Sequence, residues 1–194
     1  MNELLLQGLS ELGLDVSRAE TLERFSSLLL EKNQVMNLTA ITEPDAVAQL
    51  HLLDSAALLP FVDLTGKTVV DVGTGAGFPG MPLRILEDDF DLTLLDSLGK
   101  RVNWLQEVCD ELQLKRVACV HARAEEFAMK SVDTEDEIAA AKSAIKTLGG
   151  HIVKVEDYTI PTSDVVHRLV IVEKVSPTPR AYPRAFAKIK KAPL

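Results

Sequence analysis

The chain has 194 residues, 46% of them hydrophobic, which is enough for one α/β domain with a modest appendage and a substantial core. Its net charge of −8 argues against a protein that coats nucleic acid with its whole surface, although the stretch from Pro177 to Leu194 carries five basic residues and no acid. No apolar run resembles a membrane span or a signal peptide, and the two cysteines, Cys109 and Cys119, lack metal-ligand spacing and suit free thiols in a reducing cytoplasm.

The first 62 residues predict a helical extension. Leucines recur at helical spacing near the start of the chain and stop at Gly13. Ser17 and Glu20 have the spacing of a capping box and are expected to begin a second helix. A third helix is expected over residues 42–58, and Pro60 ends it.

From Lys67 onwards, short apolar runs alternate with helical segments. Helices are expected over residues 79–86, 100–112 and 134–148. The apolar runs predict three parallel strands, of which the first is expected to be buried, and then the two strands of a hairpin: 67–73, 91–97, 116–122, 151–160 and 165–175. Alternating strands and helices imply an α/β fold with a mainly parallel, Rossmann-like sheet and a C-terminal antiparallel hairpin.

The stretch "DVGTGAGFPG" connects the first of these strands to the helix that follows it. Read from Gly75 it matches the G-x-G-x-x-G loop of dinucleotide sites, and read from Asp71 it matches the D-x-G-x-G-x-G loop of many enzymes that use S-adenosylmethionine (SAM). Gly73, Gly75 and Gly77 let the backbone turn tightly and approach a ligand closely. A simple structural turn is the alternative explanation for these glycines.

Two acids bear on the choice between the cofactors. Asp71 stands where the first strand ends, and a carboxylate there can receive the ammonium group of SAM, whereas a nicotinamide dinucleotide offers it no such partner. Asp96 ends the second strand and can accept hydrogen bonds from ribose hydroxyls of either cofactor. Because SAM-dependent methyltransferases usually end in a hairpin, the sequence favours a SAM-binding methyltransferase domain over residues 63–176, followed by a basic tail at 177–194.

Five motifs, in this order, resemble one family: the bacterial small-subunit rRNA guanine-N7 methyltransferases (RsmG, also called glucose-inhibited division protein B). The resemblance covers nearly the whole chain and is far more specific than a glycine loop alone. The motifs are "NLT" at Asn37–Thr39, "HLLDSAALLP" at His51–Pro60, "DVGTGAGFPGMPL" at Asp71–Leu83, "LLDSLGKRVNWL" at Leu94–Leu105 and "RAEEF" at Arg123–Phe127.

This resemblance implies a SAM-methyltransferase sheet with an N-terminal helical extension, and methyl transfer from SAM to N7 of one guanine in 16S rRNA, either as naked RNA or in the small ribosomal subunit. By similarity, the SAM contacts map to Gly73 and Phe78 in the loop, Asp96 at the ribose, and Ala124 and Glu125 beside the adenine. Guanine N7 has a lone pair and no proton, so attack needs no general base. The enzyme mainly aligns the reactants, and neither a catalytic residue nor a metal is expected.

The chain departs from this family between Ala128 and Met129. Family members carry there a further strand with an "SRA" segment, a helix and the start of another strand, so the arginine of that segment has no counterpart. Without such a strand, the first strand of the sheet would present an unpaired edge. We therefore expect a segment to be missing at this point, rather than a sheet that is naturally truncated.

Several polar and basic residues are candidates for contact with RNA, and each has a structural alternative. His51 lies among apolar residues of a helix, where Asp54 can orient it. Basic residues at a helix start or in a terminal tail can equally be solvated. The candidates are Asn37, His51, Lys100, Arg101, Arg123, Lys130, Arg180 and Arg184.

Two other functions stay open on the sequence alone. The acidic composition permits a SAM enzyme that acts on a small molecule, and RNA-dependent methyl transfer would distinguish the two. The missing stretch permits a non-catalytic module that binds RNA or the ribosome, and a SAM titration would test that possibility.

Overall fold

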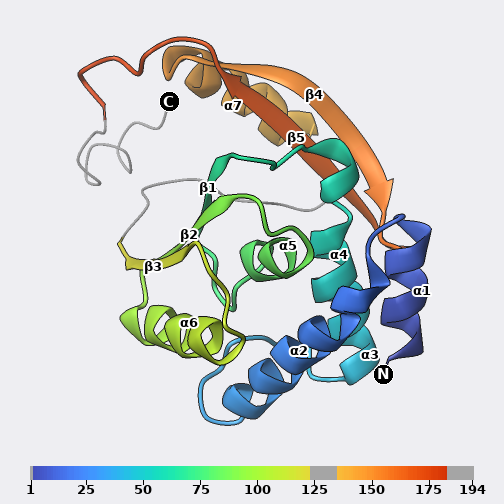
Figure 1. Ribbon diagram of the computed structural model, residues 1–194. Helices are drawn as coiled ribbons and strands as arrows, with labels where there is room; N and C mark the ends of the chain where they lie inside the picture. Colours follow the sequence, from blue (N-terminus) through green and yellow to red (C-terminus); the bar gives the residue numbers. More distant parts are fainter. Residues whose placement is uncertain (1, 123–134, 183–194) are drawn as a thin grey trace. The chain divides into compact units, whose positions relative to one another are not determined.

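The computed structural model describes residues 2–122 and 135–182, which form two compact units (Figure 1). The first unit contains residues 2–122 and 160–164, and the second contains residues 135–159 and 165–182. The helical extension and the parallel sheet belong to the same unit, and the domain boundaries expected at residues 62 and 176 stay predictions. None of the described helices is long and apolar enough to cross a membrane.

The chain begins with α1 (Glu3–Glu11), the short turn η1 (Val16–Arg18) and α2 (Ala19–Asn33). Gly13 follows α1 with a φ of 69°, as expected of a residue that ends a helix. The predicted capping box is wrong. The Asp15 carboxylate accepts the backbone N–H of Ser17 at 2.9 Å and caps η1, from which α2 continues without a side-chain cap.

The third predicted helix exists but is not regular. It consists of α3 (Pro44–Val47), the π-helical turn η2 (Ala48–Leu53) and α4 (Asp54–Ala56), and the 3₁₀ turn η3 (Leu59–Phe61) follows it. The helix therefore begins two residues later than predicted, because Pro44 occupies the first helical position, where its missing N–H is tolerated. Apolar spacing does not reveal the π turn, which is a local widening of the same helix.

Strands β1 (Thr68–Val72), β2 (Asp91–Asp96) and β3 (Val117–His121) form the predicted parallel sheet in that order. Helix α5 (Gly80–Leu86) connects β1 to β2, and α6 (Gly99–Glu111) connects β2 to β3. The register aligns Asp71, Leu94 and Cys119 across the three strands. Within the part of the chain that is described, β1 pairs with β2 alone and stands at the edge of this sheet.

Only one face of this sheet is well buried. Leu92 and Leu94 of β2 are buried, and so are Met81 of α5 and Leu105 of α6. On the other face, Val70 of β1 remains 51% exposed. The prediction that β1 is a buried strand is therefore wrong for this structure, since a parallel strand needs cover on both faces to be buried.

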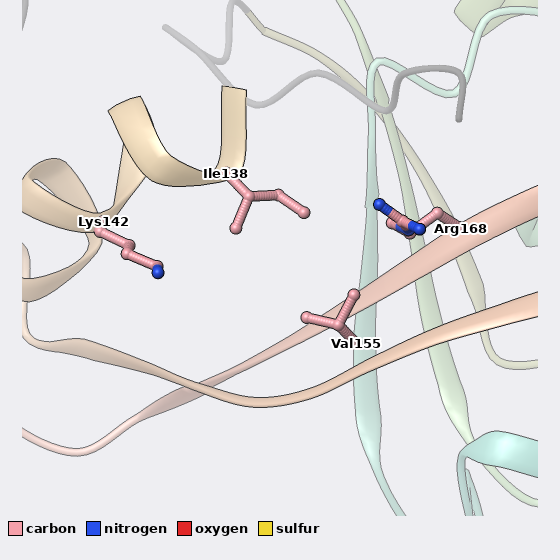
Figure 2. A pocket seen from close by; sticks show the side chains of 4 residues that line it. All are labelled: Ile138, Lys142, Val155 and Arg168. Atoms are coloured by element: carbon pink, nitrogen blue, oxygen red, sulfur yellow. The ribbon is translucent and has the colours of Figure 1, made fainter. Parts of the chain in front are cut away.

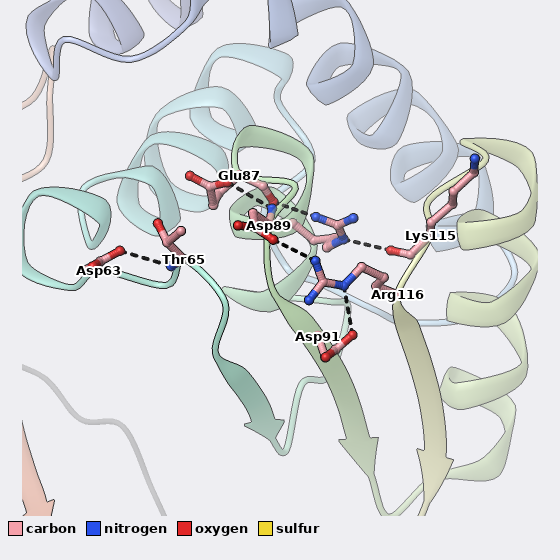
Figure 3. A network of polar contacts seen from close by, with 8 residues as sticks. Asp63, Thr65, Glu87, Asp89, Asp91, Lys115 and Arg116 are labelled. Atoms are coloured by element: carbon pink, nitrogen blue, oxygen red, sulfur yellow. Dashed lines mark hydrogen bonds and ion pairs between the residues drawn. The ribbon is translucent and has the colours of Figure 1, made fainter.

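Ion pairs and a buried arginine join the amino-terminal ends of β2 and β3 (Figure 3). Arg116 donates to the carboxylates of Asp89 and Asp91, each at 2.9 Å. The buried Arg84 donates to two backbone carbonyl groups at 2.8 and 2.9 Å and lies over the ring of Phe90. These contacts stabilise the amino-terminal end of the sheet. The loop after β1 lies at the opposite, carboxyl end, where parallel α/β sheets bind ligands.

The second unit contains α7 (Glu135–Thr147) and an antiparallel hairpin of β4 (Gly150–Thr159) and β5 (Val166–Lys174). The predicted terminal hairpin is confirmed, with a register shift between Ile152 and Lys154. Gly149 separates α7 from β4 with a φ of 83°, which is the left-handed conformation that glycine adopts most easily.

Candidate functional site

The glycine loop follows β1 at the carboxyl end of the sheet and leads into α5. Gly73, Gly75 and Gly77 have φ values of 74°, 58° and 96°, which residues with a Cβ adopt only with strain. The N–H groups of Gly73 and Thr74 both donate to the carbonyl of Leu95, at 2.7 and 3.1 Å. The loop is thus fixed to the end of β2, as the strand–loop–helix pattern predicts.

The glycines of this loop have two different surroundings. Among the described residues, a Cβ on Gly73 would meet no atom within 4 Å, and one on Gly75 would meet only a backbone oxygen at 3.8 Å. A Cβ on Gly77 would lie 2.7 Å from Met81 and 2.9 Å from Leu105. The first two glycines therefore form an open cradle that a ligand can approach, whereas Gly77 is required by packing against the helices.

Asp71 accepts two hydrogen bonds that fix the conformation of the glycine loop. Its Oδ2 accepts the Thr74 hydroxyl at 2.7 Å and the N–H of Gly80, at the start of α5, at 2.9 Å. Burial raises the pKa of this carboxyl group above its ordinary value, and the nearby Asp96 raises it further. Asp71 thus organises the loop in the structure, and its predicted contact with a ligand ammonium group stays a prediction.

Asp96 is the most buried acid of the site, with only 4% of its surface exposed. Its Oδ2 accepts the N–H of Gly75 at 3.0 Å, and its Oδ1 accepts the N–H of Leu98 at 2.7 Å. The carboxylate therefore stands directly beside the open part of the glycine loop with a fixed orientation. This position is compatible with the predicted contact to ribose hydroxyls, because each carboxylate oxygen can accept more than one hydrogen bond.

Arg101, a predicted RNA contact, extends its side chain towards Asp96. One of its terminal nitrogens is 3.8 Å from Oδ2 of Asp96. Among the described residues, its Nε is buried without a hydrogen-bond partner, which is the situation expected beside a site for a polar ligand. Lys100, the preceding residue, is exposed at the start of α6.

His51, from the second motif, contacts both Phe78 of the glycine loop and Thr39 of the first motif. The ring of His51 stacks on the ring of Phe78 with centroids 4.5 Å apart and an interplanar angle of 16°. Nε2 of His51 lies 2.8 Å from the hydroxyl of Thr39. Burial lowers the pKa of His51, so the imidazole is neutral at pH 7. The RNA candidate Asn37 is exposed in the turn before Thr39.

An aromatic cluster beneath the loop was not among the predicted site residues. Phe25 of α2 lies 5.4 Å from the ring of Phe78 and 6.4 Å from that of Trp104. Phe25 belongs to the apolar stripe of α2, and this stripe is the only sign of the cluster in the sequence. Helical spacing shows that Phe25 faces a core, but not that the core lies under the loop.

Part of the predicted site lies outside the described residues. Arg180 is exposed in the second unit. The adenine contacts and three of the RNA candidates stay predictions because the structure does not describe them: Arg123, Ala124, Glu125, Lys130 and Arg184.

The second unit has a cavity of its own, of about 370 Å³ (Figure 2). Ile138 and Lys142 of α7, Val155 of β4 and Arg168 of β5 line it. Arg168 binds the carboxylate of Asp157 through two nitrogens, at 2.6 and 2.8 Å. None of the predicted site residues that the structure describes lines this cavity. No cluster of His, Cys, Asp and Glu in the described parts of the chain could hold a metal ion.

Comparisons with known proteins show which proteins the chain is similar to. The family model described as GidB, rRNA small subunit methyltransferase G, matches residues 18–147. A ribosomal RNA small subunit methyltransferase G of Lachnoclostridium phytofermentans is 37% identical over 235 residues, with 100% of this chain and 97% of the relative covered. Its counterpart in Alkaliphilus metalliredigens is 36% identical, with 98% of each chain covered. A crystal structure of a SAM dependent methyltransferase from Aquifex aeolicus aligns with a TM-score of 0.35 and 26% identity over 44% of this chain and 46% of that one.

The alignment with the L. phytofermentans relative is longer than the chain. It runs over 235 positions, whereas the chain, which it covers completely, has 194 residues, so the chain has gaps opposite this relative. These values do not locate the gaps. A missing segment between Ala128 and Met129 is consistent with them and stays a prediction.

Proposed function

The chain belongs to the rRNA small subunit methyltransferase G family, and from this premise we propose that it transfers the methyl group of SAM to N7 of one guanine in 16S rRNA. The observation that carries the proposal is the cradle at the carboxyl end of the sheet. There, Gly73 and Gly75 leave open space, and the buried carboxylate of Asp96 lies beside it.

The residues present fit the cofactor. SAM carries no phosphate, so its site needs space for a nucleoside and for an amino-acid group rather than a pyrophosphate clamp. Gly73 and Gly75 supply space for close approach, and Asp96 supplies an acceptor for ribose hydroxyls. The buried Nε of Arg101 supplies a donor without a protein partner among the described residues.

The chemistry asks little of the protein beyond alignment. SAM supplies a methyl group that is activated by a positively charged sulfur, and guanine N7 attacks it with a lone pair in the plane of the ring. The protein removes no proton, so its contribution is to hold the two reactants in line and to exclude water. Backbone carbonyls and the carboxylates near the loop can stabilise positive charge as it moves onto the purine.

The RNA has to reach an acidic protein, and local basic residues are the means that we propose. Lys100 is exposed at the start of α6, close in sequence to Asp96, and Arg180 is exposed in the second unit. Contacts of this kind release counterions from the phosphates, so binding weakens steeply as salt rises. The reaction then takes place in the cytoplasm, the compartment in which small ribosomal subunits assemble.

A transfer assay tests the proposed function. Small ribosomal subunits from a strain without its own enzyme of this family are incubated with the purified chain and with SAM that carries a labelled methyl group. The label is expected in 7-methylguanosine of 16S rRNA, as identified by nuclease digestion and mass spectrometry. Large subunits serve as a control RNA of similar charge and are expected to stay unlabelled. Naked 16S rRNA, in parallel, identifies the preferred form of the substrate.

Three results would contradict the proposal. Label in a nucleoside other than 7-methylguanosine would reject the N7 assignment, and equal labelling of both subunits would reject the small subunit as the specific substrate. Absence of SAM binding in calorimetry, with a chain shown to be folded by circular dichroism, would reject the enzyme and favour a non-catalytic module.

A further inference from the structure

Three segments that are distant in the sequence meet at one side of the glycine loop. Thr39 comes from the turn after α2, His51 from the π-helical turn η2, and Phe78 from the loop itself. Thr39 and His51 are joined by a contact of 2.8 Å, and His51 and Phe78 by ring stacking at 4.5 Å. The helical extension therefore contacts the glycine loop through His51, in addition to the packing of Phe25 on Phe78.

The direction of the hydrogen bond between Thr39 and His51 depends on the tautomer of the imidazole, and the surroundings of the hydroxyl allow Thr39 to donate. The N–H of Ile41 donates to Oγ1 of Thr39 at 3.0 Å, so the hydroxyl proton is free to point to Nε2 of His51. Asn33 fixes the backbone of the same turn, since its Oδ1 accepts the N–H groups of Leu38 and Thr39 at 2.7 and 3.0 Å. A neutral imidazole with its proton on Nδ1 accepts this hydroxyl at Nε2.

The protonation of His51 follows from its position in the helix. Burial lowers its pKa below 6.5, and Asp54, on the same helical segment, is the charged residue that partly opposes this shift. Thr39 and Phe78, which contact the ring from other parts of the described chain, carry no charge. The π-helical turn widens the helix at this residue, and such turns occur frequently at functional sites.

Phe78 connects the stacked ring of His51 to the backbone of the glycine loop. Phe25 lies on Phe78 at 5.4 Å and is fully buried, so the ring is held between α2 and His51. The N–H groups of Gly77 and Phe78 both donate to the carbonyl of Thr74, at 2.8 and 3.1 Å. A fixed ring at Phe78 thus limits the movement of the last turn of the loop.

We propose that His51 is a positioning residue: by accepting the Thr39 hydroxyl and stacking on Phe78, it holds the glycine loop in the conformation that binds the cofactor. Its effect on the loop is independent of chemistry, whereas its effect on SAM affinity rests on the proposed function. His51 contacts neither reactant in this role. It differs in this from the RNA contact that the sequence alone left open.

Two variants remove the hydrogen bond between Thr39 and His51 from opposite sides. His51→Phe keeps an aromatic ring for stacking but removes the acceptor, and Thr39→Val keeps the shape of the side chain but removes the donor. Ser55→Ala is the matched control, because the Ser55 hydroxyl donates to the carbonyl of His51 at 2.6 Å in the same helical segment without touching the ring. His51→Phe and Thr39→Val both lose the hydrogen bond between Thr39 and His51, and Thr39→Val also removes the acceptor of the Ile41 N–H. Ser55→Ala loses a hydrogen bond of the same helical segment.

Hydrogen exchange of the loop amides, followed by mass spectrometry, is the first measurement. In the wild type the N–H groups of Gly75, Gly77, Phe78 and Gly80 are all hydrogen-bonded, so the loop peptide is expected to be protected. Both test variants are expected to exchange this peptide about fivefold faster, as the loss of one hydrogen bond implies. Ser55→Ala is expected to leave the loop peptide unchanged.

Calorimetry with SAM is the second measurement. We expect Kd to rise about fivefold in both test variants, with kcat at saturating SAM close to that of the wild type. As the pH falls through the lowered pKa of His51, the hydrogen bond has to reverse so that Nε2 donates to Oγ1 of Thr39, and we expect the SAM affinity of the wild type to change there. His51→Phe should lack this part of the pH dependence.

The outcomes are distinguishable. Wild-type loop exchange in His51→Phe and Thr39→Val would overturn the inference, and so would an equal acceleration in Ser55→Ala, which would indicate a general loosening of the helix. An identical pH profile of SAM affinity in His51→Phe and the wild type would also overturn it. Accelerated loop exchange in a chain whose wild type binds no SAM would uphold the inference about the loop and reject the proposed function.

Discussion

Alanine at Gly77 should destabilise the fold, whereas alanine at Gly73 should mainly weaken cofactor binding. Both glycines have positive φ values, 96° and 74°, so both substitutions introduce backbone strain. They differ in the space around the new methyl group. At Gly77 it would lie 2.7 Å from Cγ of Met81 and 2.9 Å from Cδ2 of Leu105, whereas at Gly73 no atom of residues 2–122 or 135–182 would lie within 4 Å.

The magnitudes follow from these distances. Left-handed strain costs about 1–2 kcal/mol for a residue with a Cβ, and it applies at both positions. Overpacking adds about 1–3 kcal/mol at Gly77, so Gly77→Ala should lose roughly 2–5 kcal/mol of the free energy of unfolding. Gly73→Ala should lose about 1–2 kcal/mol, but its methyl group enters the cradle and should reduce SAM affinity about tenfold or more.

Urea unfolding followed by fluorescence measures the first effect, because Trp104 is the one tryptophan of the chain and is buried in the first unit. Calorimetry with SAM, at a temperature where each variant is folded, measures the second. The reasoning is refuted if Gly73→Ala is as destabilised as Gly77→Ala. It is equally refuted if Gly73→Ala binds SAM with wild-type affinity, since the cradle would then not be where the cofactor lies.

Three further predictions concern the surroundings of the site. Phe25→Ala should cost about 3–5 kcal/mol of the free energy of unfolding and should alter Trp104 fluorescence, because it empties a fully buried position between two rings; a loss below about 1 kcal/mol in urea would contradict the aromatic cluster. Arg84→Met should cost roughly 2–4 kcal/mol, because two backbone carbonyl groups lose their donor; wild-type stability in the same urea assay would contradict this. Asp71→Asn should change the pH dependence of stability. The folded state raises the pKa of Asp71 above 3.8, so the stability linked to this group is greatest below 3.8 and declines as the pH rises through the folded pKa; thermal unfolding at several pH values should show this decline in the wild type and not in the variant.

Local patterns predicted the elements of the first unit well, and the reason is visible at the loop. A strand that ends in an acid, several glycines and a helix that starts after Pro79 are all encoded within a dozen residues or so. Each feature restricts the backbone by itself: glycine permits positive φ, and alternation of strand and helix implies a parallel sheet. Fold class and cofactor could therefore be inferred before any contact was known, and the family followed from the resemblance of the five motifs.

The capping box was predicted wrongly because a neighbouring residue forms a competing cap. Ser17 and Glu20 have the spacing of a capping box, but Asp15, two residues earlier, accepts the N–H of Ser17 and caps the preceding turn instead. Both patterns are chemically sound, and the entry angle of the chain into α2 decides between them. The burial expected for β1 failed for a different reason: an apolar strand is buried only if something covers it, and Val70 is half exposed.

By itself the sequence determined which backbone segments form, which residue types stand at the carboxyl end of the sheet, and which family the motifs resemble, because these depend on neighbours along the chain. The tertiary structure alone decided that Gly73 and Gly75 are open while Gly77 is packed, that Arg101 turns towards Asp96, and that His51 reaches Phe78. Those facts depend on side chains that are far apart in the sequence, and only the packing of helices on the sheet brings them together.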